Sequence, residues 1–453
     1  MSFIDVLLIF IYALLLFGSG ALILSFRPAY DRYRKYFWRG LVLKLMGGLG
    51  YALIYTFYYT YGGDTFSYFK DGVAMNNLML TDFSVYWDYV FGDLAYIDVG
   101  QYNSNRGIIH QKGTAEFFVT RFTSIFTILG MQNFYTTTLL FAFFSFIGVW
   151  LMFLVFVRRY PEIEKKMAFA VLFIPSVFFW GSGLMKDSIT IGFLGVLLYF
   201  LDKIKRKEGY RLINIIAVVI AAYIIFKVKA YILMSFLPAM ILWYFMEYRE
   251  RIKNRLIRVV SLPFFLVLTT VGISVSIVQL GKVNEDYAVE SFFKKARGIQ
   301  TWHYKDGENT SDQYGRGSSY TLGSYEETYT GLIMMFPASV NVTLFRPYIT
   351  EAENVMMMFS ALESLILMLA TIYIFIGLGF FKTIKLLTQD SFLMMCFIFA
   401  IFFAFAVGFT SYNFGALVRY KIPCIPFFVA SLLILEYKSK KQKRLKYQRR
   451  SLE

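Results

Sequence analysis

Apolar residues occur along this chain in long blocks that are separated by short charged stretches. An α-helix needs about 20 apolar residues to cross a hydrocarbon layer roughly 30 Å thick. Only helices and closed barrels satisfy their backbone hydrogen bonds in lipid, and these blocks lack the alternation of barrel strands. The pattern therefore predicts an all-α polytopic membrane protein.

Each apolar block is predicted to form one span, which gives about eleven transmembrane helices. Interfacial helices are expected in two large loops, 62–133 and 282–353, because segments such as 83–91 are rich in aromatic residues. The polar stretch 305–319 has no hydrophobic periodicity and is interpreted as a mobile loop that covers a site. The predicted spans are 3–26, 40–61, 134–157, 167–182, 188–202, 212–226, 230–247, 259–281, 354–381, 391–411 and 417–437.

Basic residues are concentrated in the short loops, whereas the two large loops contain more acidic than basic residues. Cytoplasmic loops of membrane proteins carry an excess of Lys and Arg, so the basic loops are expected in the cytoplasm and the large loops outside. Eleven spans then place the N-terminus outside and the C-terminus inside. We expect a single transmembrane bundle over 1–437, followed by a basic cytoplasmic tail at 438–453. The basic segments are 27–39, 158–166, 202–211, 247–258 and 438–453.

Composition supports a membrane protein and argues against a nucleic-acid-binding, disulfide-rich or zinc-binding protein. The chain is 57% hydrophobic and only 17% charged, and its net charge of +16 lies in the short loops rather than in a nucleic-acid-binding patch. Cys396 and Cys424 lie in apolar segments and imply no disulfide framework, and His110 and His303 do not have the spacing of a zinc site. The first block has no basic start or cleavage site, so it is expected to remain as a helix.

The first candidate site follows the second predicted span. Gly62 and Gly63 allow a tight turn, which would hold Asp64 at the membrane surface, with Tyr68 one turn later. A partly desolvated carboxylate there is suited to deprotonate a sugar hydroxyl as a general base. The alternative is that Asp64 only caps the helix that follows.

The second candidate site is the segment 175–188, which joins two short apolar blocks. Short blocks interrupted by glycine indicate a cavity sunk into the bilayer, with Lys186 and Asp187 at its floor. The alternative is a surface hairpin with an ordinary Lys–Asp pair of small energetic value.

The third candidate is the pair Lys227 and Lys229, which interrupts a long apolar stretch. Charges inside membrane segments usually mark substrate or ion pathways. The alternative is that both lysines extend to the lipid headgroups from the ends of helices.

Two later motifs contain further cations and acids. Arg346 precedes a proline and is suited to bidentate phosphate binding, and Glu351 follows it, with Glu363 in the next span. Arg419 and Lys421 lie at the mouth of a later helix. Interfacial anchoring alone would also account for either motif.

All of these charged residues fall on the predicted outer face, so we expect them to share one pocket. Cations gathered beside a carboxylate base suit reactions in which a phosphate is the leaving group. The catalytic candidate is Asp64, and the candidates for substrate binding are Tyr68, Lys186, Asp187, Lys227, Lys229, Arg346, Glu351, Arg419 and Lys421.

At these residues the chain resembles the GT-C-type membrane glycosyltransferases, and within them the bacterial polysaccharide polymerases of the EpsG and Wzy kind. The resemblance lies in Gly63-Asp64-Thr65 with Tyr68 after the second helix, in 175–186, in 346–348 and in 419–423. It implies transfer of a glycan from a polyprenyl-phosphate or polyprenyl-diphosphate carrier to a sugar hydroxyl, outside the cytoplasm, in a bacterial inner membrane. Asp64 would be the base, and Lys227, Lys229, Arg346 and Arg419 would hold the donor phosphates.

Asp64 lacks the neighbouring acid that GT-C enzymes often carry, which leaves a divalent metal requirement open. Membrane lipids and other polysaccharide-assembly proteins are expected partners. The alternatives are a transporter or flippase of lipid-linked glycans, a ligase similar to those of O-antigen assembly, and a non-enzymatic membrane scaffold.

Overall fold

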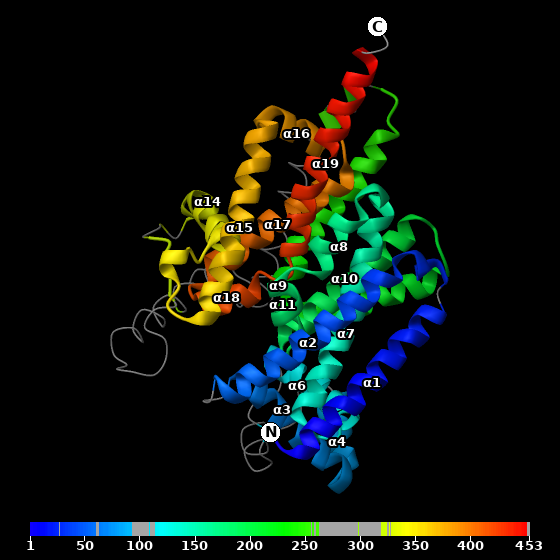
Figure 1. The fold of residues 1–453 in the computed structure, drawn as a ribbon, viewed down its shortest axis with the longest axis vertical. Coiled ribbons are helices and arrows are strands. Elements are labelled where there is room, and N and C mark those ends of the chain that lie inside the picture. The colour runs from blue at the N-terminus through cyan, green and yellow to red at the C-terminus, as the bar shows by residue number, and fades with distance from the viewer. Residues whose placement is uncertain are drawn as a thin grey trace. The chain divides into compact units, whose positions relative to one another are not determined.

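The structure is a computed structural model that describes residues 1–26, 28–59, 63–92, 108, 114–254, 256–257, 260–261, 298, 319–323, 326 and 328–450. In these residues the regular secondary structure is helical, and an isolated β-bridge joins Ser319 to Asn413 (Figure 1). The all-α prediction is therefore confirmed. The chain divides into two compact units, Met1–Leu233 and Met234–Glu453, which we call unit 1 and unit 2.

Several helices in the described residues are membrane spans by length and composition. Six are long and apolar enough to cross a bilayer, or up to eight if each of two bent pairs is one span. The molecule is thus an integral membrane protein, and the count of eleven spans stays a prediction. Almost all of the predicted span 259–281, the polar stretch up to residue 318, and both histidines lie outside the described residues.

Unit 1 contains the first large loop between two groups of spans. Its elements are α1 (Phe3–Ser25), η1 (Pro28–Tyr33), α2 (Arg34–Phe57), α3 (Asp64–Thr81), α4 (Phe83–Val90), α6 (Ala115–Leu129), α7 (Phe134–Arg159), η3 (Pro161–Ile163), α8 (Glu164–Leu172), α9 (Pro175–Phe179), η4 (Trp180–Ser182), α10 (Lys186–Lys205) and the first part of α11 (Arg211–Glu250).

Unit 2 contains the remainder of α11 and the C-terminal helices. These are α14 (Tyr329–Phe345), η6 (Ile349–Glu351), α15 (Val355–Leu378), α16 (Phe380–Thr388), α17 (Ser391–Ser411), α18 (Phe414–Tyr420) and α19 (Ile425–Arg450). The bounds of α17 coincide with the predicted span 391–411, because Asp390 caps its start and Tyr412 ends it in the left-handed conformation. The basic segment 438–450 continues α19 as a helix.

Close backbone contacts hold the spans of unit 1 together. A Cβ on Gly148 of α7 would lie 2.0 Å from the carbonyl oxygen of Gly192 in α10, and a Cβ on Gly195 would lie 1.9 Å from that of Gly148. On α2, a Cβ on Gly47 would lie 2.2 Å from the carbonyl oxygen of Phe178. Small residues let membrane helices approach closely and gain van der Waals contact, which is the main attraction between helices in lipid.

The basic end of unit 1 is held by one buried carboxylate. Asp202, near the end of α10, is 1% exposed and accepts hydrogen bonds from Arg158 (3.1 Å), Arg159 (2.7 Å) and Arg206 (2.9 Å). Three guanidinium groups compensate the desolvation of this carboxylate, so the arrangement fastens the end of α7 to the end of α10.

Two predicted spans are broken, and two others join into one interrupted helix. The segment 167–182 forms α8, α9 and η4 because Pro175 cannot continue the helix before it, and α9–η4 meets α10 at a bend of 114°. The predicted helices 212–226 and 230–247 form one run, α11, that is interrupted at Lys229 (φ −150°, ψ 80°). The segment 417–437 belongs to α18 and α19, which meet at 65°.

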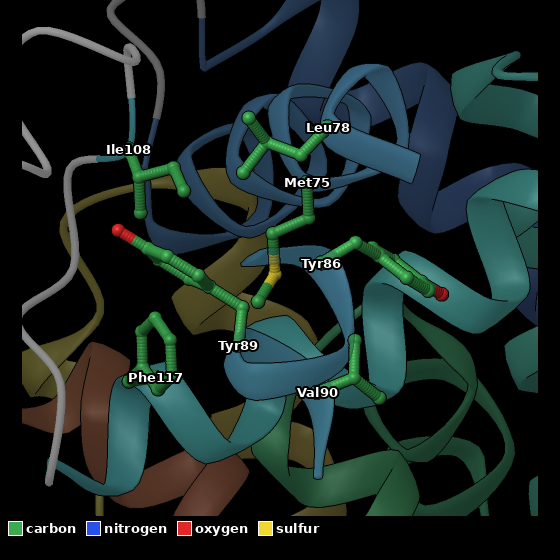
Figure 2. Close-up of a cluster of buried hydrophobic side chains, with 7 residues drawn as sticks. All are labelled: Met75, Leu78, Tyr86, Tyr89, Val90, Ile108 and Phe117. Atoms are coloured by element: carbon green, nitrogen blue, oxygen red, sulfur yellow. The ribbon is translucent and has the colours of Figure 1, made fainter. Parts of the chain in front are cut away.

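The first large loop builds a small helical layer with an apolar core of its own. Figure 2 shows side chains of α3 facing those of α4, with Phe117 of α6 beside them. The side-chain amide of Asn76 forms hydrogen bonds with the hydroxyls of Ser124 (2.8 Å) and Thr127 (2.7 Å), which joins α3 to α6. The core residues are Met75, Leu78, Tyr86, Tyr89, Val90, Ile108 and Phe117.

Candidate functional site

The start of α10 is joined to the break in α11 by a buried ion pair. The Lys229 ammonium donates to Asp187 Oδ1 at 2.5 Å, and the two side chains are 6% and 1% exposed. Asp187 lies in the first turn of α10, where the free N–H groups of the helix also favour a negative charge. Lys229 lies where the backbone leaves the helical conformation. Two sequence candidates are thus brought into direct contact.

Lys186, the first residue of α10, has a different partner from its neighbour. Its ammonium forms an ion pair with Glu116 in the first turn of α6, and its side chain is 20% exposed. The alternative of a surface pair between Lys186 and Asp187 is therefore wrong, because each residue binds a different helix. The ion pairs tie α10 both to the first large loop and to α11.

A buried lysine that was not a sequence candidate lies near the middle of α2. Lys44 is 2% exposed, and its ammonium donates to the carbonyl oxygens of Gly181 (2.6 Å) and Val177 (3.2 Å) and to Ser145 Oγ (3.0 Å). These acceptors satisfy its three protons and fix the segment α9–η4 against α2. The available signal was one lysine inside an otherwise apolar predicted span.

Asp64 is the first residue of α3, and it is exposed. Gly63 precedes it with φ of +135°, a conformation that residues with a side chain rarely adopt. The alternative that Asp64 only caps this helix is therefore wrong, because Gly63 is the N-cap residue. Asp64 follows it in the first turn, where the helix dipole favours its charge, and its carboxylate remains accessible. Tyr68, one turn later, is buried. Tyr61 and Gly62 lie outside the described residues.

Lys227 differs from Lys229, although both belong to the same motif. Lys227 is exposed, and its ammonium lies 5.8 Å from the centroid of the Tyr223 ring. Such a contact between a cation and an exposed aromatic ring is weak and leaves the ammonium accessible. The two lysines therefore have separate environments, one open and one buried.

In unit 2, Arg346 and Glu351 bind each other. Arg346 Nε donates to both carboxylate oxygens at 3.0 Å, Nη2 donates to Oε1, and the Tyr348 N–H donates to Oε2 at 2.8 Å. Burial works to raise the pKa of the Glu351 carboxyl, but these hydrogen bonds outweigh it and hold the pKa below its ordinary value.

Aromatic rings surround the Arg346 guanidinium. Its carbon lies 5.1 Å from the ring centroid of Phe414 and 5.7 Å from those of Tyr320 and Tyr348. Tyr320 is fixed by hydrogen bonds from its hydroxyl to the Gly408 carbonyl (2.9 Å) and from its N–H to the Tyr412 carbonyl (3.1 Å). Burial raises the pKa of the Tyr320 phenol, so it stays neutral. Tyr320 lies in the second loop and was missed from the sequence.

Lys421 lies in the break between α18 and α19 and is 2% exposed. Its ammonium donates to Ser364 Oγ (3.0 Å), and Ser364 in turn donates to the Arg346 carbonyl (3.2 Å). Arg419 lies two residues earlier, in the last turn of α18, and is partly buried. Lys421 is thus linked to Arg346 through one serine.

Five of the sequence candidates form two groups, one in each unit. Asp187 and Lys229 are in contact in unit 1, and Arg346, Glu351 and Lys421 are linked in unit 2, whereas Asp64 and Lys227 are exposed. Within the described part of the chain, no group of three or more His, Cys, Asp or Glu side chains is placed to hold a metal ion. The expectation that all candidates share one pocket stays a prediction.

Comparison with known proteins does not assign the chain to a family. No family model, curated protein or solved structure matches it. The function is therefore argued from the residues.

Proposed function

We propose that the protein is a membrane glycosyltransferase that moves a glycan from a polyprenyl-phosphate or polyprenyl-diphosphate donor to a sugar hydroxyl. The observation that carries the proposal is the contrast among the three acidic candidates. Asp187 and Glu351 are neutralised by Lys229 and Arg346, whereas Asp64 is exposed and has no ion pair to a described residue. Asp64 is thus the acid that can accept a proton from a substrate.

The chemistry assigns one role to the carboxylate. Asp64 takes the proton of the acceptor hydroxyl while that oxygen bonds to the anomeric carbon of the donor sugar. The bond between the anomeric carbon and the phosphate oxygen breaks, and its electron pair leaves with the polyprenyl (di)phosphate. Cations that contact the leaving phosphate lower the barrier, because negative charge develops on that oxygen.

Arg346 is the best-prepared phosphate ligand among the cationic candidates. A guanidinium has five N–H protons, and the bonds to Glu351 use those of Nε and one of Nη2. The side chain is 18% exposed, and its aromatic neighbours hold it in one orientation. A phosphate that approaches Nη1 would therefore meet a fixed cation at small entropic cost.

The three candidate lysines of unit 1 differ in how well they are placed to bind the donor phosphates. Lys227 is exposed and Lys186 is partly exposed, so both are open to an anionic group. Lys229 is buried against Asp187 and is better suited to hold the helix break in place. We assign Lys186 and Lys227 to donor binding and Lys229 to positioning.

The test is glycan transfer by purified protein in proteoliposomes with a labelled polyprenyl-diphosphate-linked oligosaccharide and a sugar acceptor. Asp64→Asn should lower the rate at least 100-fold, the usual contribution of a general base, and Asp64→Glu should retain part of it. Asp88→Asn is the control, because Asp88 is exposed on α4 in the same loop. Equal rates for Asp64→Asn and the parent would refute the assignment.

A second candidate function, transport of a lipid-linked glycan, is favoured by the broken spans. α9–η4 meets α10 at 114°, α18 meets α19 at 65°, and α11 is interrupted at Lys229. Discontinuous helices with charged residues at the break are typical of transporter binding sites. A transporter would move a fluorescent lipid-linked glycan between leaflets of a liposome, and Asp64→Asn would leave that rate unchanged.

A further inference from the structure

A basic hollow lies in unit 1, apart from the candidate sites. It is formed where η1 and the start of α2 meet η3 and the start of α8, and it is open to solvent. Four cationic and two acidic side chains line it, so the net charge of its lining is positive. The lining residues are Arg32, Lys35, Pro161, Glu162, Ile163, Glu164, Lys165 and Lys166.

Glu164 organises the hollow. Its carboxylate accepts hydrogen bonds from Lys35 Nζ (3.3 Å) and the Tyr36 hydroxyl (3.1 Å), and it lies 3.5 Å from Arg32 Nη2. Burial works to raise the pKa of Glu164, but Lys35, Tyr36 and Arg32 outweigh it and hold that pKa below its ordinary value. The carboxylate therefore stays charged and holds two cations that remain more than half exposed, at 63% and 51%.

The surroundings point to a lipid rather than to a soluble anion. Arg32 and Lys35 lie over the rings of Tyr33 (5.4 Å) and Tyr36 (4.8 Å), and tyrosines beside cations are typical of the boundary between lipid and water. The spans that lead away from the hollow expose large apolar side chains, such as Phe26 at the end of α1 and Met46 on α2. Acyl chains could lie along these spans.

We propose that this hollow binds the headgroup of an anionic phospholipid. The phosphate contacts Arg32, Lys35 and Lys165, and the acyl chains cover the apolar surfaces of α1 and α2. Basic pockets at the ends of membrane helices recognise such headgroups through the charges of Lys and Arg. The site is separate from the glycosyl-transfer proposal and does not depend on it.

The experiment measures phosphatidylglycerol binding to the full chain in detergent, by native mass spectrometry, with phosphatidylcholine as the reference lipid. The variant R32Q/K165Q should bind phosphatidylglycerol roughly 30-fold more weakly, since each of the two cations near a lipid surface contributes roughly a fivefold factor in affinity. Phosphatidylcholine binding should not change. The control K385Q/K443Q removes two exposed lysines of unit 2 that do not line the hollow.

An equal loss in the control would show a general effect of surface charge and overturn the proposal. Soluble glycerol 3-phosphate at millimolar concentration is the second probe: it should displace little phosphatidylglycerol, and efficient displacement would identify a site for free phosphates instead. If R32Q/K165Q fails to fold, the single variant K165Q replaces it, because Lys165 is exposed. K165Q should bind phosphatidylglycerol several-fold more weakly, and unchanged binding would overturn the proposal.

Discussion

The Lys229 ammonium lies 2.5 Å from Asp187 Oδ1, and both side chains are almost completely buried. Asp187 lies in the first turn of α10, and Lys229 lies at the break of α11. One interaction therefore joins two irregular points in the membrane part of unit 1. Breaks in membrane helices persist where side chains or neighbouring helices compensate for the lost regularity.

Removing one partner of this pair should strongly destabilise the protein. Lys229→Met leaves the Asp187 carboxylate buried without its cation, which typically costs about 3–5 kcal/mol. The double variant K229M/D187L should recover much of this loss, because an apolar pair needs no desolvation. Thermal unfolding of all variants in the same detergent gives the comparison. A double variant no more stable than K229M would show that the pair is not the main interaction between these positions.

Lys44→Met should destabilise unit 1 because the hydrogen bonds of the Lys44 ammonium are lost. Methionine keeps the length of the side chain but removes the Lys44 hydrogen bonds to the Val177 and Gly181 carbonyls, of which Gly181 keeps only the bond from Ser145, at a cost of about 1–3 kcal/mol. Limited proteolysis should also reach the segment α9–η4 sooner. Lys385→Met is the matched control on an exposed face of α16 and should change neither measurement. Equal behaviour of the two variants would rule out a fastening role for Lys44.

The glycine contacts predict a sharp contrast between two alanine substitutions. Gly148→Ala would place a methyl group 2.0 Å from the Gly192 carbonyl oxygen, so α7 and α10 must separate, at a cost of about 1–3 kcal/mol or more. A Cβ on Gly377 of α15 would meet nothing within 4 Å. Gly377→Ala should therefore be neutral, or stabilising by up to about 1 kcal/mol through helix propensity. Unfolding temperatures of the two variants check the contrast, and similar values would contradict it.

Much of the helical layout followed from hydropathy, because lipid demands long apolar helices. The bounds of α17 and the start of α7 are as predicted, since Asp390 and Asn133 supply side-chain caps that a sequence displays. The breaks were harder to predict. The interruption at Lys229 falls between the predicted helices 212–226 and 230–247, but its pairing with Asp187, from a helix distant in sequence, could not be recognised.

In the candidate sites, too, the sequence indicated some features and not others. Charged residues in apolar segments could be recognised, but their partners could not, because pairing depends on tertiary packing. Glu116 lies 70 residues before Lys186, and Tyr320 comes from a loop without periodicity. Lys44 was passed over because its partners are backbone carbonyls, which leave no trace in a sequence.

The pair Arg346–Glu351 should make stability depend on pH at the acidic end. The pKa of Glu351 is lower in the folded protein than its ordinary value of 4.5. The pair therefore contributes fully above about pH 4.5, and its contribution is lost as the pH falls through the folded pKa. Glu351→Gln should lower the unfolding temperature at pH 7 and have a smaller effect at pH 3. Because both side chains are partly exposed, the difference is on the order of 1 kcal/mol.

Glu353→Gln is the control for this measurement, because Glu353 is an exposed carboxylate two residues later. It should leave the unfolding temperature unchanged at both pH values. A pH-independent loss of stability in Glu351→Gln would mean that the uncharged hydrogen bonds of the side chain, such as that from the Tyr348 N–H, account for its effect. Arg346 would then be held mainly by the rings of Tyr320, Tyr348 and Phe414, and its charge would be less compensated than the ion pair implies.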